Sequence, residues 1–283
     1  MGELAMTFKN LLVHLDDSPG CAGRLAVAID LARTHEAHLT GLHVAADPIL
    51  PGGMRGELPA HFLSALEEQT VLRSQTVMAN FNKTVAKSGL AADGRSVRGP
   101  ATEVASIVSQ HARYTDLVIL GQPEPEPSSD TGPHFAEDVI LSSGRPALVV
   151  PYIGAGKSLG RRVLVAWDGG REAARAVNDA LPFLKAADKV AVLVINPDQG
   201  DHGPEPGADI SLHLARHGVR AEAQHLTADD LSIANALLSR LVDLDIDLLV
   251  MGAYGHSRLR EWILGGVTKE IFEQMTVPVL MSH

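Results

Sequence analysis

The stretch RRVLVAWDGG, residues 161–170, decides the fold, because KNLLVHLDDS at residues 9–18 repeats it. In both stretches a basic or polar entry leads into an apolar strand that ends on an aspartate. The two aspartates are Asp16 and Asp168, an offset of 168 − 16 = 152. Two further pairs follow in the same order: TDLVILG (115–121) with IDLLVMG (246–252), and RPALVV (145–150) with VPVLMS (277–282). Internal similarity on this scale indicates two homologous domains in tandem.

Within each half, short apolar strands alternate with longer amphipathic stretches. The first half predicts strands at 11–15, 38–44, 95–97, 117–120 and 146–150, and helices at 22–33, 60–88 and 102–112. The second half predicts strands at 163–167, 190–195, 221–225, 248–251 and 278–282, and helices at 171–186, 210–217, 232–241 and 267–275. In the first helix, Leu25, Ala26, Ile29 and Leu31 are expected to form the apolar side.

This alternation predicts an α/β fold. Right-handed crossovers give each half a mostly parallel, doubly wound, Rossmann-like sheet of five strands, covered by helices on both faces. We expect one domain at residues 1–152 and the other at 160–283, with the boundary in the glycine-rich stretch PYIGAGKSLG at 151–160.

Composition excludes several classes of protein. The 283 residues are 45% apolar and 20% charged, which is typical of a globular chain. A formal net charge of −10 and only 4% aromatic residues argue against nucleic-acid binding. The single cysteine, Cys21, allows no internal disulfide and fits a reducing compartment. No run predicts a membrane span, so a cytoplasmic protein without membrane or nucleic-acid partners is expected.

Four glycines surround a loop near the end of the second half. Gly252 and Gly255 directly follow an apolar strand, and Gly265 and Gly266 directly precede a predicted helix. In open parallel sheets, ligands bind beyond the carboxyl ends of the strands, and the free amides at a helix N-terminus favour anions. The loop therefore predicts a phosphate cradle. The alternative is that these glycines serve only the geometry of the loop.

At this point the chain resembles the universal stress protein (UspA) family in its tandem, two-domain form. Nucleotide-binding members of that family carry G-x2-G-x9-G-[ST] after the fourth strand, and Gly252, Gly255 and Gly265 match this spacing. An aspartate at the end of the first strand is the other hallmark, matched by Asp168. The last motif position departs, because Gly266 replaces the Ser or Thr; Thr268 is a candidate substitute for the missing hydroxyl.

The resemblance implies that the two proline-led strands, 146–150 and 278–282, pair inside one chain as a pseudo-dimer, which would also cover two apolar sheet edges. A homodimer of two chains is expected in addition.

The resemblance also implies an ATP site, with Mg²⁺ as a companion ion, in an adenine-nucleotide α-hydrolase-like fold. It places Asp168 near the ribose and adenine and the backbone of Val194 against the adenine. Gly252, Gly255, His256 and Ser257 would line the ribose and phosphates, and Gly265, Gly266, Val267 and Thr268 would hold the phosphate tail. Arg258 and Arg260 are better explained as solvated surface residues than as phosphate ligands.

The first half differs at the corresponding loop. After Gly121 no second glycine follows at the motif spacing, and Glu124 and Glu126 bring negative charge to the place of a phosphate. Pro123, Pro125 and Pro127 also remove backbone donors. We therefore interpret the first domain as lacking the phosphate loop. Its long 60–88 region is expected to cover the empty site or to bind something else.

Other candidate motifs give weaker indications of a function. GAGKS at 154–158 lacks the first glycine of a Walker A loop and is interpreted as linker. His213 and His217 share a helix face without a local third ligand, and Cys21 has no identifiable base, so neither predicts a metal or catalytic site. No catalytic constellation is found, and ATPase activity, if present, is expected to be weak.

The sequence thus predicts a stress-response binding or regulatory module that holds ATP in its second domain. Two alternatives remain open: a nucleotide-free scaffold that binds a protein or an apolar ligand, and a slow nucleotide hydrolase.

Overall fold

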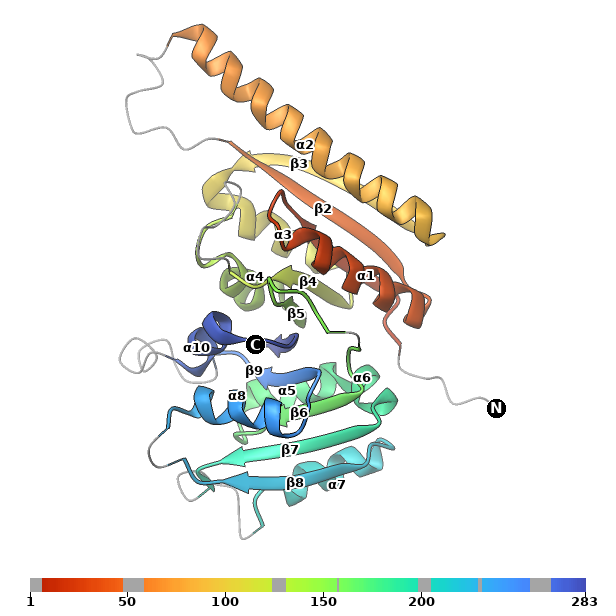
Figure 1. Ribbon diagram of the computed structural model, residues 1–283, viewed down its shortest axis with the longest axis vertical. Coiled ribbons are helices and arrows are strands. Elements are labelled where there is room, and N and C mark those ends of the chain that lie inside the picture. The colour runs from red at the N-terminus through yellow and green to blue at the C-terminus, as the bar shows by residue number, and fades with distance from the viewer. Residues whose placement is uncertain are drawn as a thin grey trace. The chain divides into compact units, whose positions relative to one another are not determined.

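The computed structural model describes residues 7–47, 59–123, 131–156, 158–197, 205–228, 231–254 and 266–283. The chain divides into two compact units, a first unit at Phe8–Ser143 and a second unit at Gly144–His283. Each is an α/β unit with a mostly parallel sheet, which confirms the predicted fold class (Figure 1).

The first unit contains four parallel strands in the order β3-β2-β1-β4. Its elements are β1 (Asn10–Leu15), α1 (Cys21–His35), β2 (His38–Asp47), α2 (Ala60–Ser88), β3 (Ala92–Pro100), a short 3₁₀ helix (Ala101–Glu103), α3 (Val104–Ala112), β4 (Leu117–Gly121) and α4 (Phe135–Ser143). Helices α1 and α2 contact each other, and so do α3 and α4. Right-handed crossovers place one pair on each face of the sheet.

The second unit has six strands in the order β5-β10-β9-β6-β7-β8. Its elements are β5 (Ala147–Val150), β6 (Arg162–Ala166), α5 (Arg171–Asp179), α6 (Leu181–Ala186), β7 (Lys189–Ile195), α7 (Ala208–Arg216), β8 (Ala221–Leu226), α8 (Ile233–Asp243), β9 (Leu248–Gly252), α10 (Val267–Gln274) and β10 (Val279–Ser282). The winding reverses at β6, because β7 lies on one side of it and β9 on the other. This reversal makes the carboxyl ends of β6 and β9 the expected place for a ligand.

The two proline-led strands pair with each other, as predicted. Strand β10 runs antiparallel to β5, with Val279 opposite Val149 and Met281 opposite Ala147. Because of this pairing β5 belongs to the second unit, so the compact units divide between Ser143 and Gly144. The domain limits predicted from the repeat lie further along the chain and stay a prediction about homology.

Several details differ from the expected elements, and α4 was not among the expected helices. The helix expected at 171–186 is two helices, because Ala180 ends α5 and begins α6, and Pro182 in the first turn of α6 cannot donate to a preceding carbonyl. Strand β3 is longer than 95–97, since it pairs with β2 over nine residues. Ala26 is exposed, whereas Arg24 is buried on the inner side of α1, which the apolar pattern did not predict.

Helix α2 is fixed to its sheet by one aromatic side chain. Phe81 is fully buried and lies on the backbone of β2 and β3, where a Cβ on Gly41 would be only 2.5 Å from the ring. A Cβ on Gly94 would likewise be 2.5 Å from Met78 of the same helix. The two glycines thus form a notch for α2. A Cβ at Gly41 would meet the rigid, buried ring of Phe81, whereas one at Gly94 would mainly displace the flexible end of Met78.

Candidate functional site

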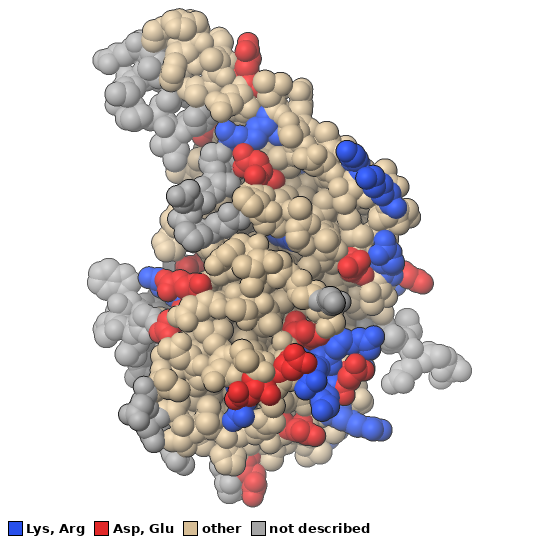
Figure 2. Space-filling view, in the orientation of Figure 1, with Lys and Arg blue, Asp and Glu red and all other residues tan. Residues whose placement is uncertain are grey.

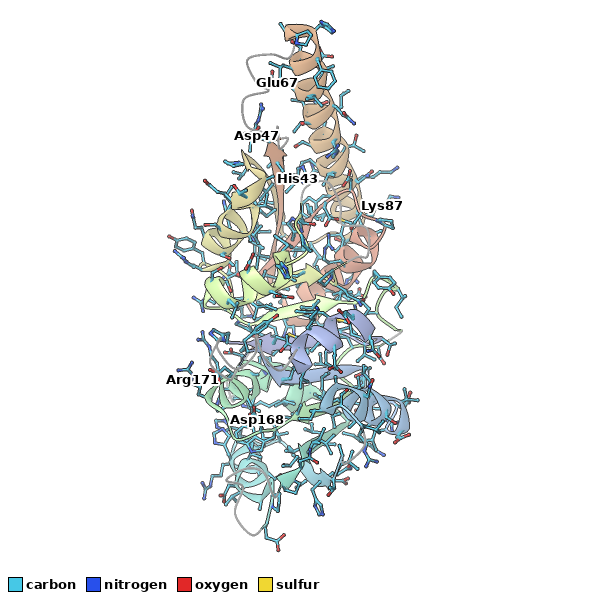
Figure 3. All side chains as sticks on the ribbon, turned by 90° about the vertical axis from the view of Figure 1, so that its left-hand side faces the viewer. His43, Asp47, Glu67, Lys87, Asp168 and Arg171 are labelled. Atoms are coloured by element: carbon cyan, nitrogen blue, oxygen red, sulfur yellow. The ribbon has the colours of Figure 1, made fainter. Side chains whose placement is uncertain are left out.

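Asp168 stands at the carboxyl edge of the second unit, directly beyond β6. Its side chain is exposed, and its Oδ1 accepts a hydrogen bond from the backbone N–H of Gly170 at 2.8 Å. The positive φ of 76° at Gly169 allows the tight turn that leads from this aspartate into α5. Asp168 and Arg171 project from this edge of the unit (Figure 3). The carboxylate is therefore held by the turn with one oxygen engaged and remains open to solvent.

Gly252 ends β9 beside this turn. A Cβ at Gly252 would lie 2.5 Å from the backbone nitrogen of Ala173 and 2.7 Å from the carbonyl carbon of Glu172, both in the first turn of α5. The neighbouring atoms are backbone, so they have no rotamer with which to make room. Close packing of β9 against α5 by itself requires glycine here, in addition to any role in approaching a ligand.

Glu172 is a buried carboxylate that the sequence analysis did not single out. It lies in the first turn of α5 and forms an ion pair with the exposed Arg171. A negative charge at this end of a helix is stabilised by the free amide groups of the first turn. The available signal was an acidic residue in the first turn after Gly170, the N-cap of α5.

Gly266 and the start of α10 form the far side of the loop that follows β9. Gly266 is the N-cap of α10 with φ −59° and ψ 150°, a conformation that any residue adopts. Val267 and Thr268 occupy the first turn, and Thr268 is buried. The first-turn amides of α10 are suited to an anion. The backbone angles at position 266 therefore do not require a glycine.

Val194 is fully buried in β7, one residue before the strand ends, and pairs with His225 of β8. Its side chain belongs to the core, so a ligand could contact only its backbone, and the contact with adenine that the resemblance implies stays a prediction. Gly255, His256, Ser257 and Gly265 of the predicted site lie outside the described residues, as do Arg258 and Arg260. The match to the full glycine motif therefore rests on sequence.

The corresponding edge of the first unit is built differently. Asp16, the counterpart of Asp168, is buried, and its Oδ1 lies 2.8 Å from Nη2 of Arg24. The Nε of Arg24 donates to the backbone oxygen of His14 at 2.8 Å, and Ser18 Oγ donates to Asp16 at 2.6 Å. A Cβ on Gly121, at the end of β4, would lie 2.1 Å from Arg24 Nη1. The guanidinium therefore lies across the ends of β1 and β4.

Burial and pairing set the charges in this group. Burial alone would raise the pKa of Asp16, but the Arg24 guanidinium and the Ser18 hydrogen bond outweigh it and hold that pKa well below its ordinary value. Burial lowers the pKa of His14 to about 3, so its imidazole is neutral at physiological pH. Burial also raises the pKa of the Cys21 thiol.

Little space is left at this edge of the first unit. The cavity lined by His14, Asp16, Arg24 and Phe135 has a volume of about 30 Å³. This is room for about two water molecules. This volume is small compared with that of a nucleoside. Glu124, Pro125, Glu126 and Pro127, from which the sequence predicted the loss of a phosphate loop, lie outside the described residues. Arg24 and His14, which occupy this edge, are a separate reason to expect no nucleotide site in the first unit, and the sequence did not reveal it.

Within the described ranges, no group of three or more His, Cys, Asp or Glu side chains is arranged to hold a metal ion. The rings of His213 and His217 contact each other, with centroids 4.7 Å apart. Among the same residues no helix has both the length and the apolar character needed to cross a membrane. On the visible face, Figure 2 shows acidic and basic side chains interspersed over the second unit.

Comparisons with known proteins agree with this geometry. The model of the universal stress protein family matches residues 160–283. The universal stress protein Slr1230 of Synechocystis sp. is 28% identical over 174 residues, which are 58% of this chain and 57% of that protein. The match therefore spans little more than half the length of this curated relative.

Solved structures show the same fold. A universal stress protein from Archaeoglobus fulgidus superposes with a TM-score of 0.73 at 17% identity, over 96% of this chain and 95% of its own. A putative universal stress protein from Pseudomonas aeruginosa gives a TM-score of 0.58 at 12% identity, over 99% and 95% of the two chains. Residues 160–283 thus match the universal stress protein family, and the fold of the chain is that of solved universal stress proteins.

Proposed function

We propose that the chain binds an adenine nucleotide, ATP with Mg²⁺, at the carboxyl edge of β6, β7 and β9, and serves as a stress-response binding module. The observation that carries the proposal is the contrast between the two aspartates. Asp168 is exposed at the point where the winding reverses, whereas Asp16 is buried against Arg24. The residue at the position of Arg24 in the second repeat, 24 + 152 = 176, is Ala176.

The remaining parts of the site support the same ligand. The turn at Gly169 and Gly170 fixes Asp168, which suits a carboxylate that accepts hydrogen bonds from ribose hydroxyls. The first turn of α10 offers amide donors to phosphate, and Thr268 is the nearest described hydroxyl in that turn. The G-x2-G-x9-G spacing of residues 252, 255 and 265 completes the cradle in this proposal. Mg²⁺ is proposed to enter with the phosphates, because that ion commonly binds through few protein ligands.

Calorimetric titration of the purified full chain with ATP and Mg²⁺ tests the proposal. Asp168→Ala is expected to weaken binding about tenfold or more, since a hydrogen bond to a charged group contributes roughly 1.5–3 kcal/mol. Asp188→Ala is the matched control, because Asp188 is also exposed and lies at the opposite, amino edge of the same sheet beside Arg161. The Asp188→Ala variant should bind ATP with the same affinity as the unmodified chain.

Absence of heat at millimolar ATP would overturn the nucleotide proposal and favour the scaffold alternative. Binding that survives Asp168→Ala unchanged would mean that the site is misplaced. Gly252→Val is unsuitable as a probe, because the substitution would clash with the backbone of α5 and disturb the fold itself. Release of phosphate in proportion to the amount of protein, and lost in Asp168→Ala, would promote the hydrolase alternative.

A further inference from the structure

A groove of about 640 Å³ opens at the amino edge of the second unit, opposite the carboxyl edge at which Asp168 stands. It is lined by the first residues of β6, β7 and β8, by α7 and the turn after it, and by the residues that lead into β9. This volume is in the ordinary range for a small-molecule site. Much of the lining is apolar, which suits a ligand with an apolar part, and includes Val163, Val190, Val219, Leu244 and Ile246.

Three cations form a row along this groove. Arg162 is opposite Lys189 in the pairing of β6 with β7, and Arg220 directly precedes Ala221, which is opposite Val190 in the pairing of β7 with β8. All three cations line the groove. Like charges on neighbouring strands at the same level repel each other. In a chain with a formal net charge of −10, a row of this kind favours an anionic ligand.

The described residues neutralise this row only in part. Nη1 of Arg162 lies 3.4 Å from Oδ2 of Asp245, whereas Lys189 and Arg220 form no ion pair with any residue that the structure describes. Figure 2 shows basic side chains gathered with acidic ones near the amino ends of β7 and β8, toward the lower right of the view. The row therefore has charge left for a ligand.

Two polar atoms of the lining side chains also lack partners. Nε of Arg162 and Oγ of Ser211 are buried and have no hydrogen-bond partner within the described part of the chain. Leaving buried donors unpaired is unfavourable, and a carboxylate oxygen in the groove would accept from either one after a small rotation of its side chain.

The balance of charges sets the charge of the ligand. Five charged side chains line the groove, namely Arg162, Lys189, Arg220, Asp188 and Glu222. Three are cations and two are carboxylates, so the lining has an excess of one positive charge. The partners outside the groove, Arg161 beside Asp188 and Asp245 beside Arg162, cancel each other. One negative charge on the ligand completes this balance, whereas a polyphosphate would exceed it and be repelled by Glu222.

We propose that this groove binds an amphipathic monoanion, an acyl chain that ends in one carboxylate. The carboxylate lies beside Lys189 and Arg220, and the chain covers apolar lining residues such as Val219 and Ile246. Burial of the chain supplies most of the affinity, and the cations select the charge of the head group. The proposal is independent of nucleotide binding, because the two sites are at opposite edges of the sheet.

Calorimetric titration of the full chain with decanoate, below the concentration at which it forms micelles, tests the proposal. Lys189→Gln/Arg220→Gln is expected to raise the dissociation constant roughly tenfold or more, because two charge-assisted contacts with the carboxylate are lost. Glu222→Gln should lower the constant severalfold, since it removes a repulsive charge. Arg216→Gln, an exposed arginine of α7 that does not line the groove, is the matched control and should leave the constant unchanged.

A steric variant tests the location. Ala215 is an exposed residue of α7 that lines the groove, so Ala215→Trp should fill it and abolish the heat of decanoate binding. Ala208→Trp, at an exposed position of the same helix outside the lining, should bind decanoate normally. Circular dichroism checks that every variant is folded. Saturating ATP should not displace decanoate, which separates this proposal from that of the nucleotide site.

Two further probes separate the contributions of the head group and the chain. Acetate has the carboxylate without the chain, and decyltrimethylammonium has the chain with the opposite charge, so neither should bind at the concentrations at which decanoate does. Absence of heat at millimolar decanoate, equal binding of decyltrimethylammonium, competition by ATP, or binding that survives Ala215→Trp unchanged would each overturn the proposal.

Discussion

Nη2 of Arg24 lies 2.8 Å from Oδ1 of Asp16, and both side chains are buried at the carboxyl edge of β1. The guanidinium is held further by the backbone oxygen of His14 and lies against Gly121. In a tandem repeat, the same edge of the fold is thus closed by an internal cation in one copy and left open beside Asp168 in the other.

Removing the Arg24 side chain alone should strongly destabilise the first unit. Arg24→Ala leaves Asp16 as an uncompensated buried charge, and breaking a buried pair in this way destabilises by about 3–5 kcal/mol. The urea midpoint of the transition assigned to the first unit should fall accordingly. Arg33→Ala removes an exposed arginine of the same helix, paired with Asp30, and should leave that midpoint nearly unchanged. If Asp16→Asn/Arg24→Leu were less stable than Arg24→Ala, the uncompensated charge would not be the cause.

Stability should also depend on pH through His14. Its folded pKa of about 3 is below the ordinary value of 6.5, so the unfolded chain binds the proton more readily between these two pH values. The free energy of unfolding should therefore decrease as pH falls below 6.5, by about 2–3 kcal/mol at pH 4.5. Asp16, whose folded pKa is also lowered, adds a further loss only below its ordinary value of 3.8.

Denaturation of the unmodified chain and of His14→Gln at a series of pH values checks this prediction. His35 and His111, whose pKa values burial lowers, contribute slopes of the same sign in both proteins. The difference between the two proteins isolates His14. Equal slopes from pH 6.5 to 4.5 would contradict the assignment of a neutral, buried imidazole.

Phe81 should be the main anchor of α2. Phe81→Ala is expected to destabilise the first unit by about 3–5 kcal/mol, because a fully buried aromatic ring is lost. Gly41→Ala should also destabilise it, since the new Cβ would meet that ring at 2.5 Å. In the Phe81→Ala background, however, Gly41→Ala should become nearly neutral. Thermal denaturation of the four proteins measures this coupling, and strict additivity of the two substitutions would exclude the contact. Phe62→Ala, on the exposed part of α2, serves as the control.

Gly266→Ser should tighten ATP binding. Its backbone angles accept any residue, so the hydroxyl expected at this motif position can be added without strain. A gain of severalfold in the calorimetric affinity is expected, with Gly266→Ala as the control that adds a Cβ but no hydroxyl. Serine also caps α10, so a rise in thermal stability without ligand should accompany it. Equal affinity in the serine and alanine variants would argue against a phosphate beside residue 266.

The repeat and the alternation of strands and helices predicted the architecture well, because hydrophobic periodicity reports which faces are buried. The pairing of β5 with β10 was expected from the family resemblance, and the register of the two strands confirms it. Hydrophobic periodicity failed at Arg24, since an arginine within an apolar helix is interpreted as solvated unless its partner is known. Asp16 lies eight residues away, and only the fold brings the two together.

The candidate site was predicted in part for the same reason. Asp168 and Gly252 follow strands that the sequence identifies, and parallel strands bring their carboxyl ends to one edge. That Gly252 is needed against the backbone of α5 could not be predicted, because close packing of backbones leaves no pattern of side chains. Glu172 was not predicted for a similar reason, because the burial of an acidic residue depends on its tertiary neighbours.

The antiparallel pairing of β5 with β10 has a consequence for how the chain folds while it is being synthesised. The two strands are separated by 279 − 150 = 129 residues, so their contact has a very large sequence separation. While the ribosome is still making the second half, β5 has left the tunnel without the strand it needs. Until the residues of β10 emerge, its backbone donors on that side are open to other nascent chains, and a chaperone that shields extended apolar segments would act in this interval.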